Sequence, residues 1–117
     1  MGLPGAGSCR AAGGPLMDHS EMVTLAGRLA ERYSVRWAYW PDSRKVQGCT
    51  GFPDIILCGS HRFMVREIKA GMDTLNPGQT AWRYSLISAG IDWGVWRLAD
   101  FISGRAEQEM KNLNEQR

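Results

Sequence analysis

The sequence predicts a small α/β domain in which a helix is followed by three strands, a second helix, a fourth strand and a C-terminal helix. Three observations predict this class: an amphipathic segment over residues 18–33, two apolar segments around a tight turn at residues 59–62, and a capped segment from residue 76 to Gly90 that separates the third strand from the fourth. The chain has 117 residues, 44% of them hydrophobic, so one such domain can bury its own core.

The first helix is predicted over about residues 18–33. Asp18 is a suitable N-cap, and Glu21 three residues later completes the pattern of a capping box. The apolar residues of this segment recur at helical spacing: Met22, Leu25, Ala26, Leu29 and Tyr33. Residues 1–16 are rich in glycine and proline without apolar periodicity, so they are expected to form a disordered tail ahead of a domain over residues 17–117.

Three strands are predicted to follow the first helix. Val35, Trp37 and Tyr39 occupy alternate positions, which is the period of a strand, and residues 41–52 then form a polar loop. The segments PDIILCG and RFMVREIK indicate two further strands, joined by a tight turn at residues 59–62.

The second half of the chain contains a helix, a strand and a last helix. Asn76 is the expected N-cap of the second helix, with a proline in its first turn and Gln79 at its third position, and Gly90 ends it. The segment IDWGVWRL is the fourth strand. Asp100 is expected to cap a single C-terminal helix that reaches Leu113.

The composition excludes several classes of protein. Fourteen Lys and Arg residues against twelve Asp and Glu give a net charge of +2, which by itself does not indicate a polyanionic partner. The three cysteines are odd in number and lack a C-x-x-C spacing, which argues against a disulfide framework or a cysteine zinc site. No stretch approaches 18 consecutive apolar residues and no signal-peptide pattern is present, so we expect a soluble cytoplasmic protein without membrane contact.

The pairing of the predicted hairpin brings two acidic residues together. A turn centred between residues 60 and 61 pairs Asp54 with Glu67, at a Cβ separation of about 4.5–5.5 Å. Two carboxylates at that separation repel each other, and a hard divalent cation bound by their oxygens removes the repulsion. Lys69 projects from the same face as Glu67, where an ammonium can hold an attacking water or neutralise charge on a phosphoryl oxygen.

The alternative interpretation is a surface hairpin with a solvated Glu–Lys pair, because the triplet Glu67-Ile68-Lys69 alone is a weak signal. The pairing and the position of Asp54 after Pro53 favour a site for phosphodiester hydrolysis.

These residues resemble a known family. Gly51-Phe52-Pro53-Asp54 followed by Glu67-Ile68-Lys69 resembles the PD-(D/E)xK nuclease signature. The Gly-Phe-Pro-Asp form, with Ser43-Arg44 upstream and Gln79 downstream, is similar to its virus-type replication–repair (VRR-NUC) branch, and the end of the fourth strand resembles stand-alone phage and actinobacterial members. The resemblance implies a restriction-endonuclease-like core of helix, three strands, helix and strand, in a protein of a bacterial or phage-infected cell.

The resemblance implies a metal-dependent nuclease. Asp54, Glu67 and the Ile68 carbonyl would bind Mg²⁺ or Mn²⁺, and Lys69 would orient or activate the attacking water. Glu21 would complete the metal site directly or through a water, and Gln79 would hydrogen-bond near the lysine or the phosphate. Helix capping is the alternative role of both of these residues.

Other polar and aromatic residues are assigned more general roles. Ser43, Arg44 and Lys45 would contact DNA phosphates, with a solvated basic loop as the alternative. His19 and His61 are predicted to be a helix-start and a turn residue. The pairing places one arginine, Arg66, on the face opposite Glu67, and four tryptophans are expected in the core or a dimer interface rather than stacked on bases: Trp37, Trp82, Trp93 and Trp96.

The expected function is that of a structure-selective DNA endonuclease resembling a Holliday-junction resolvase, whose two symmetric cuts a homodimer would supply. A flap or nicking nuclease of the same fold is one alternative, and a nucleic-acid-binding module that has lost the chemistry is another. The presence of Asp54, Glu67 and Lys69 favours an active enzyme over such a module.

Overall fold

A four-stranded sheet lies at the centre of the computed structural model, which describes residues 17–40 and 47–116. Its strands, hydrogen-bonded in this order, are β1 (Arg36–Tyr39), β2 (Ile55–Cys58), β3 (Phe63–Ile68) and β4 (Asp92–Trp96). β1 pairs with β2 and β2 with β3 in antiparallel fashion, and β4 runs parallel to β3. The predicted tail over residues 1–16 and the predicted DNA-contacting residues at positions 43–45 lie outside the described residues.

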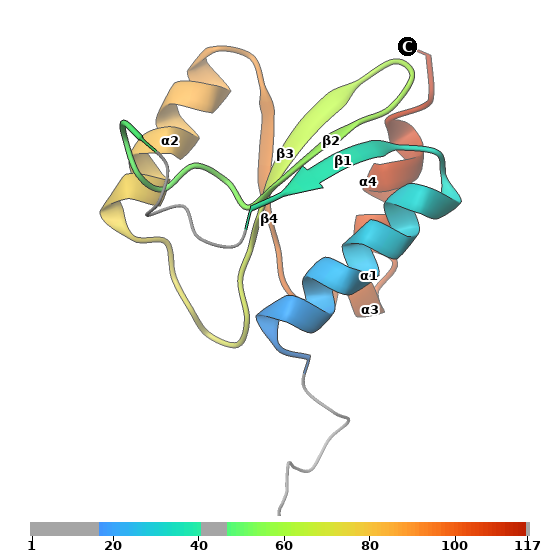
Figure 1. The fold of residues 1–117 in the computed structure, drawn as a ribbon, viewed down its shortest axis with the longest axis horizontal. Coiled ribbons are helices and arrows are strands. Elements are labelled where there is room, and N and C mark those ends of the chain that lie inside the picture. Colours follow the sequence, from blue (N-terminus) through green and yellow to red (C-terminus); the bar gives the residue numbers. More distant parts are fainter. Residues whose placement is uncertain (1–16, 41–46, 117) are drawn as a thin grey trace, which may run out of the picture.

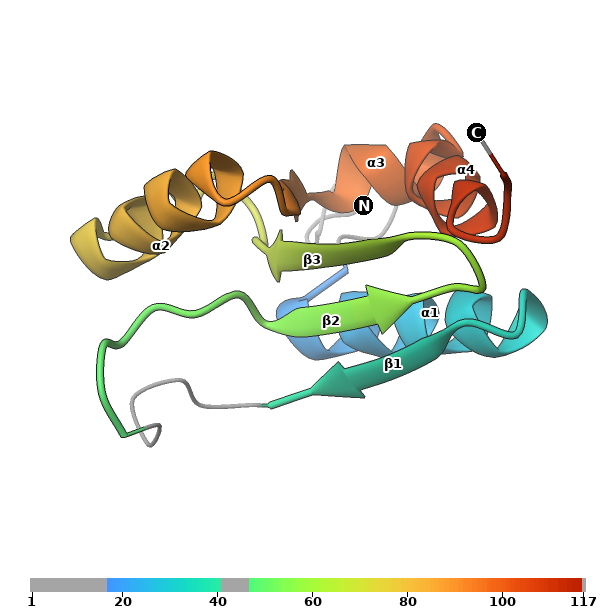
Figure 2. The ribbon, with the colours of Figure 1, turned by 90° about the horizontal axis from the view of Figure 1, so that it is seen from above.

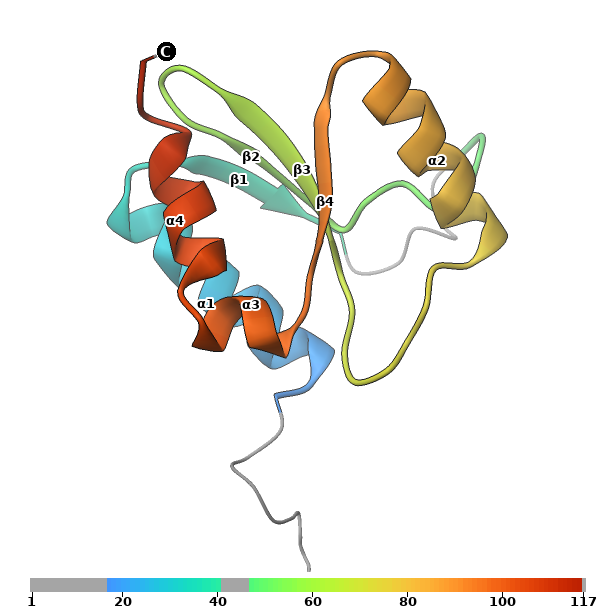
Figure 3. The ribbon, with the colours of Figure 1, turned by 180° about the vertical axis from the view of Figure 1, so that it is seen from behind.

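Helices cover both faces of the sheet. They are α1 (His19–Arg32), α2 (Pro77–Ser88), α3 (Leu98–Ile102) and α4 (Arg105–Asn112). Figures 1 and 3 show α1, α3 and α4 on one face and α2 on the other. The predicted α/β class is confirmed, and within the described ranges no helix is sufficiently long and apolar to cross a membrane.

The predicted first helix is confirmed as α1. Asp18 is its N-cap and forms the expected capping box with Glu21. The side of α1 that packs toward the sheet carries small and medium apolar residues, which form the core together with residues of β2, β3 and α4: Met22, Val23, Ala26, Leu29 and Ala30. This packing fixes which side of α1 faces the strands.

The hairpin has the predicted register. Ile56 pairs with Val65 and Cys58 with Phe63, and the Gly59 N–H donates to the Arg62 carbonyl at 2.9 Å to close the turn. The turn is tied to the C-terminal segment, because the N–H groups of residues 61 and 62 both donate to the carbonyl of residue 113 at 3.0 Å. Figure 2 shows this end of the hairpin beside the end of α4.

The segment before β2 packs closely on the start of α2. Gly51 has φ +96°, and a Cβ atom at this position would lie 2.4 Å from the Gly78 carbonyl carbon and 2.6 Å from the Gln79 nitrogen. Only glycine fits both the backbone conformation and the contact. The glycine of the Gly-Phe-Pro-Asp motif therefore brings the chain that leads into Asp54 against the helix that carries Gln79.

The C-terminal region differs from the prediction. It contains two helices instead of one, because Gly104 adopts a left-handed conformation with φ +85° between α3 and α4. The predicted N-cap, Asp100, lies inside α3, where its carboxylate accepts a hydrogen bond from the Arg97 N–H at 2.7 Å. After the break, Met110 of α4 and Leu113, which follows the helix, are buried in the core.

A buried arginine in β3 forms an ion pair with α4. Arg66 is 5% exposed, and its guanidinium lies 3.1 Å from Asp92 and 3.1 Å from Glu109. Glu109 also accepts a hydrogen bond from the Trp96 indole at 2.8 Å. The prediction that Arg66 faces away from Glu67 is confirmed, and its role here is structural.

Removing Glu109, the less exposed of the two acidic partners of Arg66, is expected to destabilise the fold. Glu109→Ala should lower the free energy of unfolding by about 3 kcal/mol, because a buried charge and the Trp96 indole both lose their acceptor. Asp92→Ala is the matched control, since the Asp92 side chain is 59% exposed and should contribute about 1 kcal/mol or less. Urea denaturation measures the loss of unfolding free energy in each variant. Equal losses would contradict the expectation that Glu109 contributes more to stability than Asp92.

Two variants distinguish the steric effect of the close contact at Gly51 from the effect of its positive φ. Gly51→Ala should cost about 3 kcal/mol or more, since it adds a clash to a positive φ. Gly48→Ala should cost only about 1 kcal/mol, because Gly48 also has a positive φ but a Cβ atom added to it would have nothing within 4 Å. If urea denaturation gives the same loss for the two variants, the contact with α2 is not what requires glycine.

Candidate active site

Two carboxylates meet at the point where β2 begins. Glu67 lies in β3 and is 3% exposed, while the Asp54 side chain, directly before β2, is 18% exposed. The register that pairs Ile55 with Arg66 places Asp54 opposite Glu67. Burial, the Asp54 charge and a hydrogen bond with Asp54 raise the pKa of Glu67 to about 9, against the opposing effect of Lys69. The two acids thus share one site, as the pairing predicts.

The backbone of β3 holds Asp54 in place. The Ile68 N–H donates to Asp54 Oδ2 at 2.9 Å, and the Lys69 N–H donates to the Trp96 carbonyl at 3.0 Å. The end of β3 is therefore fixed to the acidic segment on one side and to β4 on the other. Lys69 is half-buried, and its charge acts on the pKa of Glu67.

Gln79 caps α2 and also forms a hydrogen bond with Glu67. Its side-chain oxygen accepts from the Asn76 N–H at 3.0 Å, and its backbone N–H donates to Asn76 Oδ1 at 2.9 Å, which completes the capping box of α2. Its side-chain nitrogen donates to Glu67 Oε2 at 2.9 Å. Helix capping and contact with the site are thus combined in one side chain. Its partner in the site is Glu67, and the expected contact with the lysine or the phosphate stays a prediction.

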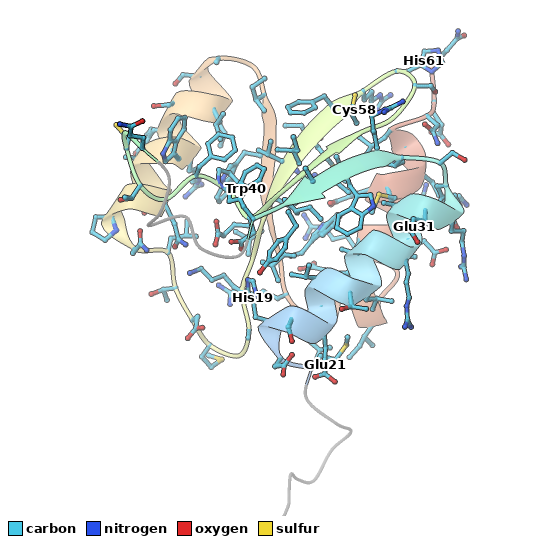
Figure 4. The ribbon with its side chains drawn as sticks, viewed as in Figure 1. His19, Glu21, Glu31, Trp40, Cys58 and His61 are labelled. Carbon is cyan, nitrogen blue, oxygen red and sulfur yellow. The ribbon has the colours of Figure 1, made fainter. Side chains whose placement is uncertain are left out.

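Glu21 is placed differently from the two other acids. It is exposed, and its Oε1 accepts from the Asp18 N–H at 2.9 Å, so its side chain is engaged in the capping box of α1. Figure 4 shows Glu21 at the outer end of the helix. The structure does not bring it into contact with Asp54 or Glu67, and its role as a metal ligand stays a prediction.

His19 contacts the site, although the sequence suggested only a helix-start residue. It is indeed the first residue of α1, but its Nε2 lies 3.3 Å from Asp54 Oδ2. No spacing rule links residue 19 to residue 54, so only the packing of α1 on the sheet could reveal this contact. His61 is a turn residue as predicted, and its Nδ1 lies 3.1 Å from the Asn114 carbonyl.

The donor set matches a cation that keeps part of its water shell. Within residues 17–40 and 47–116, no group of three or more His, Cys, Asp and Glu side chains is placed to hold a metal ion. Asp54 and Glu67 supply two carboxylates, and Mg²⁺ is commonly bound by one or two carboxylates with waters and substrate phosphates as its other ligands. Asp54 faces the buried Glu67, and a cation bound between the two carboxylates would remove their repulsion.

The tryptophans are distributed over several environments. Trp96 is fully buried in the core, as expected. The rings of Trp82 and Phe52 lie edge to face with their centroids 4.9 Å apart, and the Trp82 indole N–H donates to the Cys49 carbonyl at 3.2 Å. These two contacts hold the loop before β2 against α2. Trp93 lies under the Arg83 guanidinium at 5.5 Å.

Comparisons with known proteins support the fold. No protein-family model matches the sequence, and no curated protein matches it. One solved structure, described as a VRR_NUC domain protein, superposes with a TM-score of 0.62 at 19% sequence identity and covers 86% of this chain and 93% of its own. The expectation of a VRR-NUC-like core is confirmed at the level of the fold. The chain therefore has the fold of a VRR_NUC domain.

Proposed function

We propose that the protein is a metal-dependent DNA endonuclease that hydrolyses phosphodiester bonds. The observation that carries this proposal is the pair of facing carboxylates, the partly exposed Asp54 and the buried Glu67, with the Lys69 charge acting on Glu67. The VRR_NUC-type fold supports the same class, because the solved structure that it resembles aligns along most of this chain.

The metal site would use groups at the ends of β2 and β3. Asp54 and Glu67 would supply carboxylate oxygens, and the Ile68 main-chain carbonyl would supply a third oxygen. Mg²⁺ or Mn²⁺ bound there would provide Lewis-acid activation of the phosphodiester and of the attacking water.

The remaining groups act on orientation and charge. Lys69 would hold the attacking water or neutralise charge that develops on the phosphoryl oxygens. Gln79 donates to Glu67 Oε2 and so restricts the rotation of that carboxylate, and Oε1 does not take part in this hydrogen bond. Because the same glutamine caps α2, the geometry of Glu67 depends on the position of that helix.

Branched DNA is the proposed substrate, with activity like that of a Holliday-junction resolvase. A resolvase makes two symmetric cuts, and one chain of this protein supplies one site, so we propose that a homodimer is the active form. Ser43, Arg44 and Lys45 precede the acidic segment in the sequence and are proposed to contact phosphates, which positions DNA without reading its bases. The setting proposed for this activity is the cytoplasm of a bacterial or phage-infected cell.

A cleavage panel tests the activity and the substrate together. Wild-type protein is incubated in Mg²⁺ or Mn²⁺ with linear duplex, single strand, flap and four-way junction, beside Asp54→Asn and Lys69→Ala. Junctions are expected to be cut fastest, and each substitution should reduce the rate by at least about 100-fold. An Asp54→Asn variant as active as wild type would refute the mechanism. Equal cutting of duplex, or a preference for flaps, would refute only the junction preference, and DNA binding without cleavage would indicate an inactive binding module.

The carboxylate pair also predicts a pH dependence of stability in EDTA. Because the pKa of Glu67 rises from 4.5 to about 9 on folding, its protonation stabilises the metal-free fold fully below about pH 4.5, and this stabilisation is lost as the pH rises through 9. Thermal denaturation should therefore show a melting temperature that falls between pH 5 and 9. Glu67→Gln should flatten this dependence, since a neutral amide replaces the acid. An unchanged slope in the variant would assign the dependence to another group.

A further inference from the structure

The start of α1 supplies a side chain that touches one of the proposed metal ligands. His19 Nε2 lies 3.3 Å from Asp54 Oδ2, with the imidazole 38% and the carboxylate 18% exposed. The Tyr39 ring lies beside the imidazole at a centroid distance of 6.2 Å, so the histidine is bordered by β1 on one side and by the acid on the other. Figure 4 shows His19 directed from α1 toward the centre of the molecule.

Two donors converge on the same oxygen of Asp54. The Ile68 N–H donates to Oδ2 at 2.9 Å, and His19 Nε2 approaches this oxygen from α1. A carboxylate oxygen only accepts hydrogen bonds, so a hydrogen bond at this contact requires the hydrogen to be on Nε2. With Oδ2 occupied by these donors, Oδ1 is the oxygen available to a cation.

His19 and Glu21 point to different sides of α1 in this structure. A helix turns by about 100° per residue, so side chains two positions apart point in nearly opposite directions. His19 is on the side that faces Asp54, and Glu21 is exposed and bonded to the Asp18 N–H. The helix therefore contributes a hydrogen-bond donor to the acidic pair in place of a third carboxylate.

We propose that His19 is a positioning residue of the metal site: it donates a hydrogen bond to Asp54 Oδ2 and holds the carboxylate in the orientation in which Oδ1 binds the cation. This inference rests on the proposed nuclease function. In other metalloproteins, removal of a group that orients a metal ligand in this way commonly weakens metal binding by about 10- to 100-fold.

Calorimetric titration of Mn²⁺ into the full chain tests the inference without measuring catalysis. His19→Ala should weaken Mn²⁺ binding by about tenfold or more, because Asp54 loses one of its two donors. His19→Gln should restore most of the affinity, since the amide nitrogen of glutamine can take the place of Nε2 and donate to the same oxygen. Glu21→Gln should leave the affinity within about twofold of wild type, because Glu21 does not touch the acids.

The outcomes separate this inference from the function on which it rests. Absence of both Mn²⁺ binding and cleavage in the wild-type protein would overturn the proposed function. Normal wild-type binding with His19→Ala unchanged, or with His19→Gln as weak as His19→Ala, would overturn the positioning role alone. Weak binding by Glu21→Gln beside normal binding by His19→Ala would assign the α1 contribution to Glu21 instead. Urea denaturation in EDTA verifies that each variant is folded during the titration.

Discussion

The repulsion between Asp54 and Glu67 is the constraint on which the rest of the site depends. Two facing carboxylates, one of them buried, cannot both be charged without a cation or several hydrogen-bond donors beside them; otherwise one of them takes up a proton. The chain supplies donors from three directions: the backbone N–H of Ile68, the amide of Gln79 and the imidazole of His19. These groups come from β3, α2 and α1, so the acidic pair connects elements on both faces of the sheet.

The two capping boxes show how one local motif can have different consequences. At the start of α2, Gln79 completes the box and still has an amide group left to reach Glu67. At the start of α1, the engaged oxygen of Glu21 lies on the exposed side of the helix, away from the acids. An amide carries a donor and an acceptor, so it can satisfy a backbone N–H and a carboxylate together, whereas a carboxylate can only accept. This chemistry allows Gln79 to cap α2 and contact Glu67 at the same time, whereas the orientation of Glu21 keeps it away from the acids.

Much of the fold could be predicted from the sequence because it is specified locally. The hairpin register follows from a short turn, and the starts of α1 and α2 follow from Asp18 and Asn76. The break at Gly104 could not be predicted, since a glycine within an amphipathic pattern is compatible with a continuous helix until the core selects the orientation of α4. The contact of His19 with Asp54 escaped prediction for a related reason, because the rotation of α1 about its axis is set by its packing on the sheet.

β3 carries two buried ionisable residues in succession, the basic Arg66 and the acidic Glu67, on opposite faces of the sheet. A slip of β3 by one residue would exchange the faces to which its side chains point. Glu67 would then face Glu109 in place of Arg66, so the α4 side of the sheet would hold two acids without the guanidinium that now balances Glu109. The order of these two residues is therefore expected to exclude mispaired hairpins during folding, and the acid that serves the site also acts as a determinant of strand alignment.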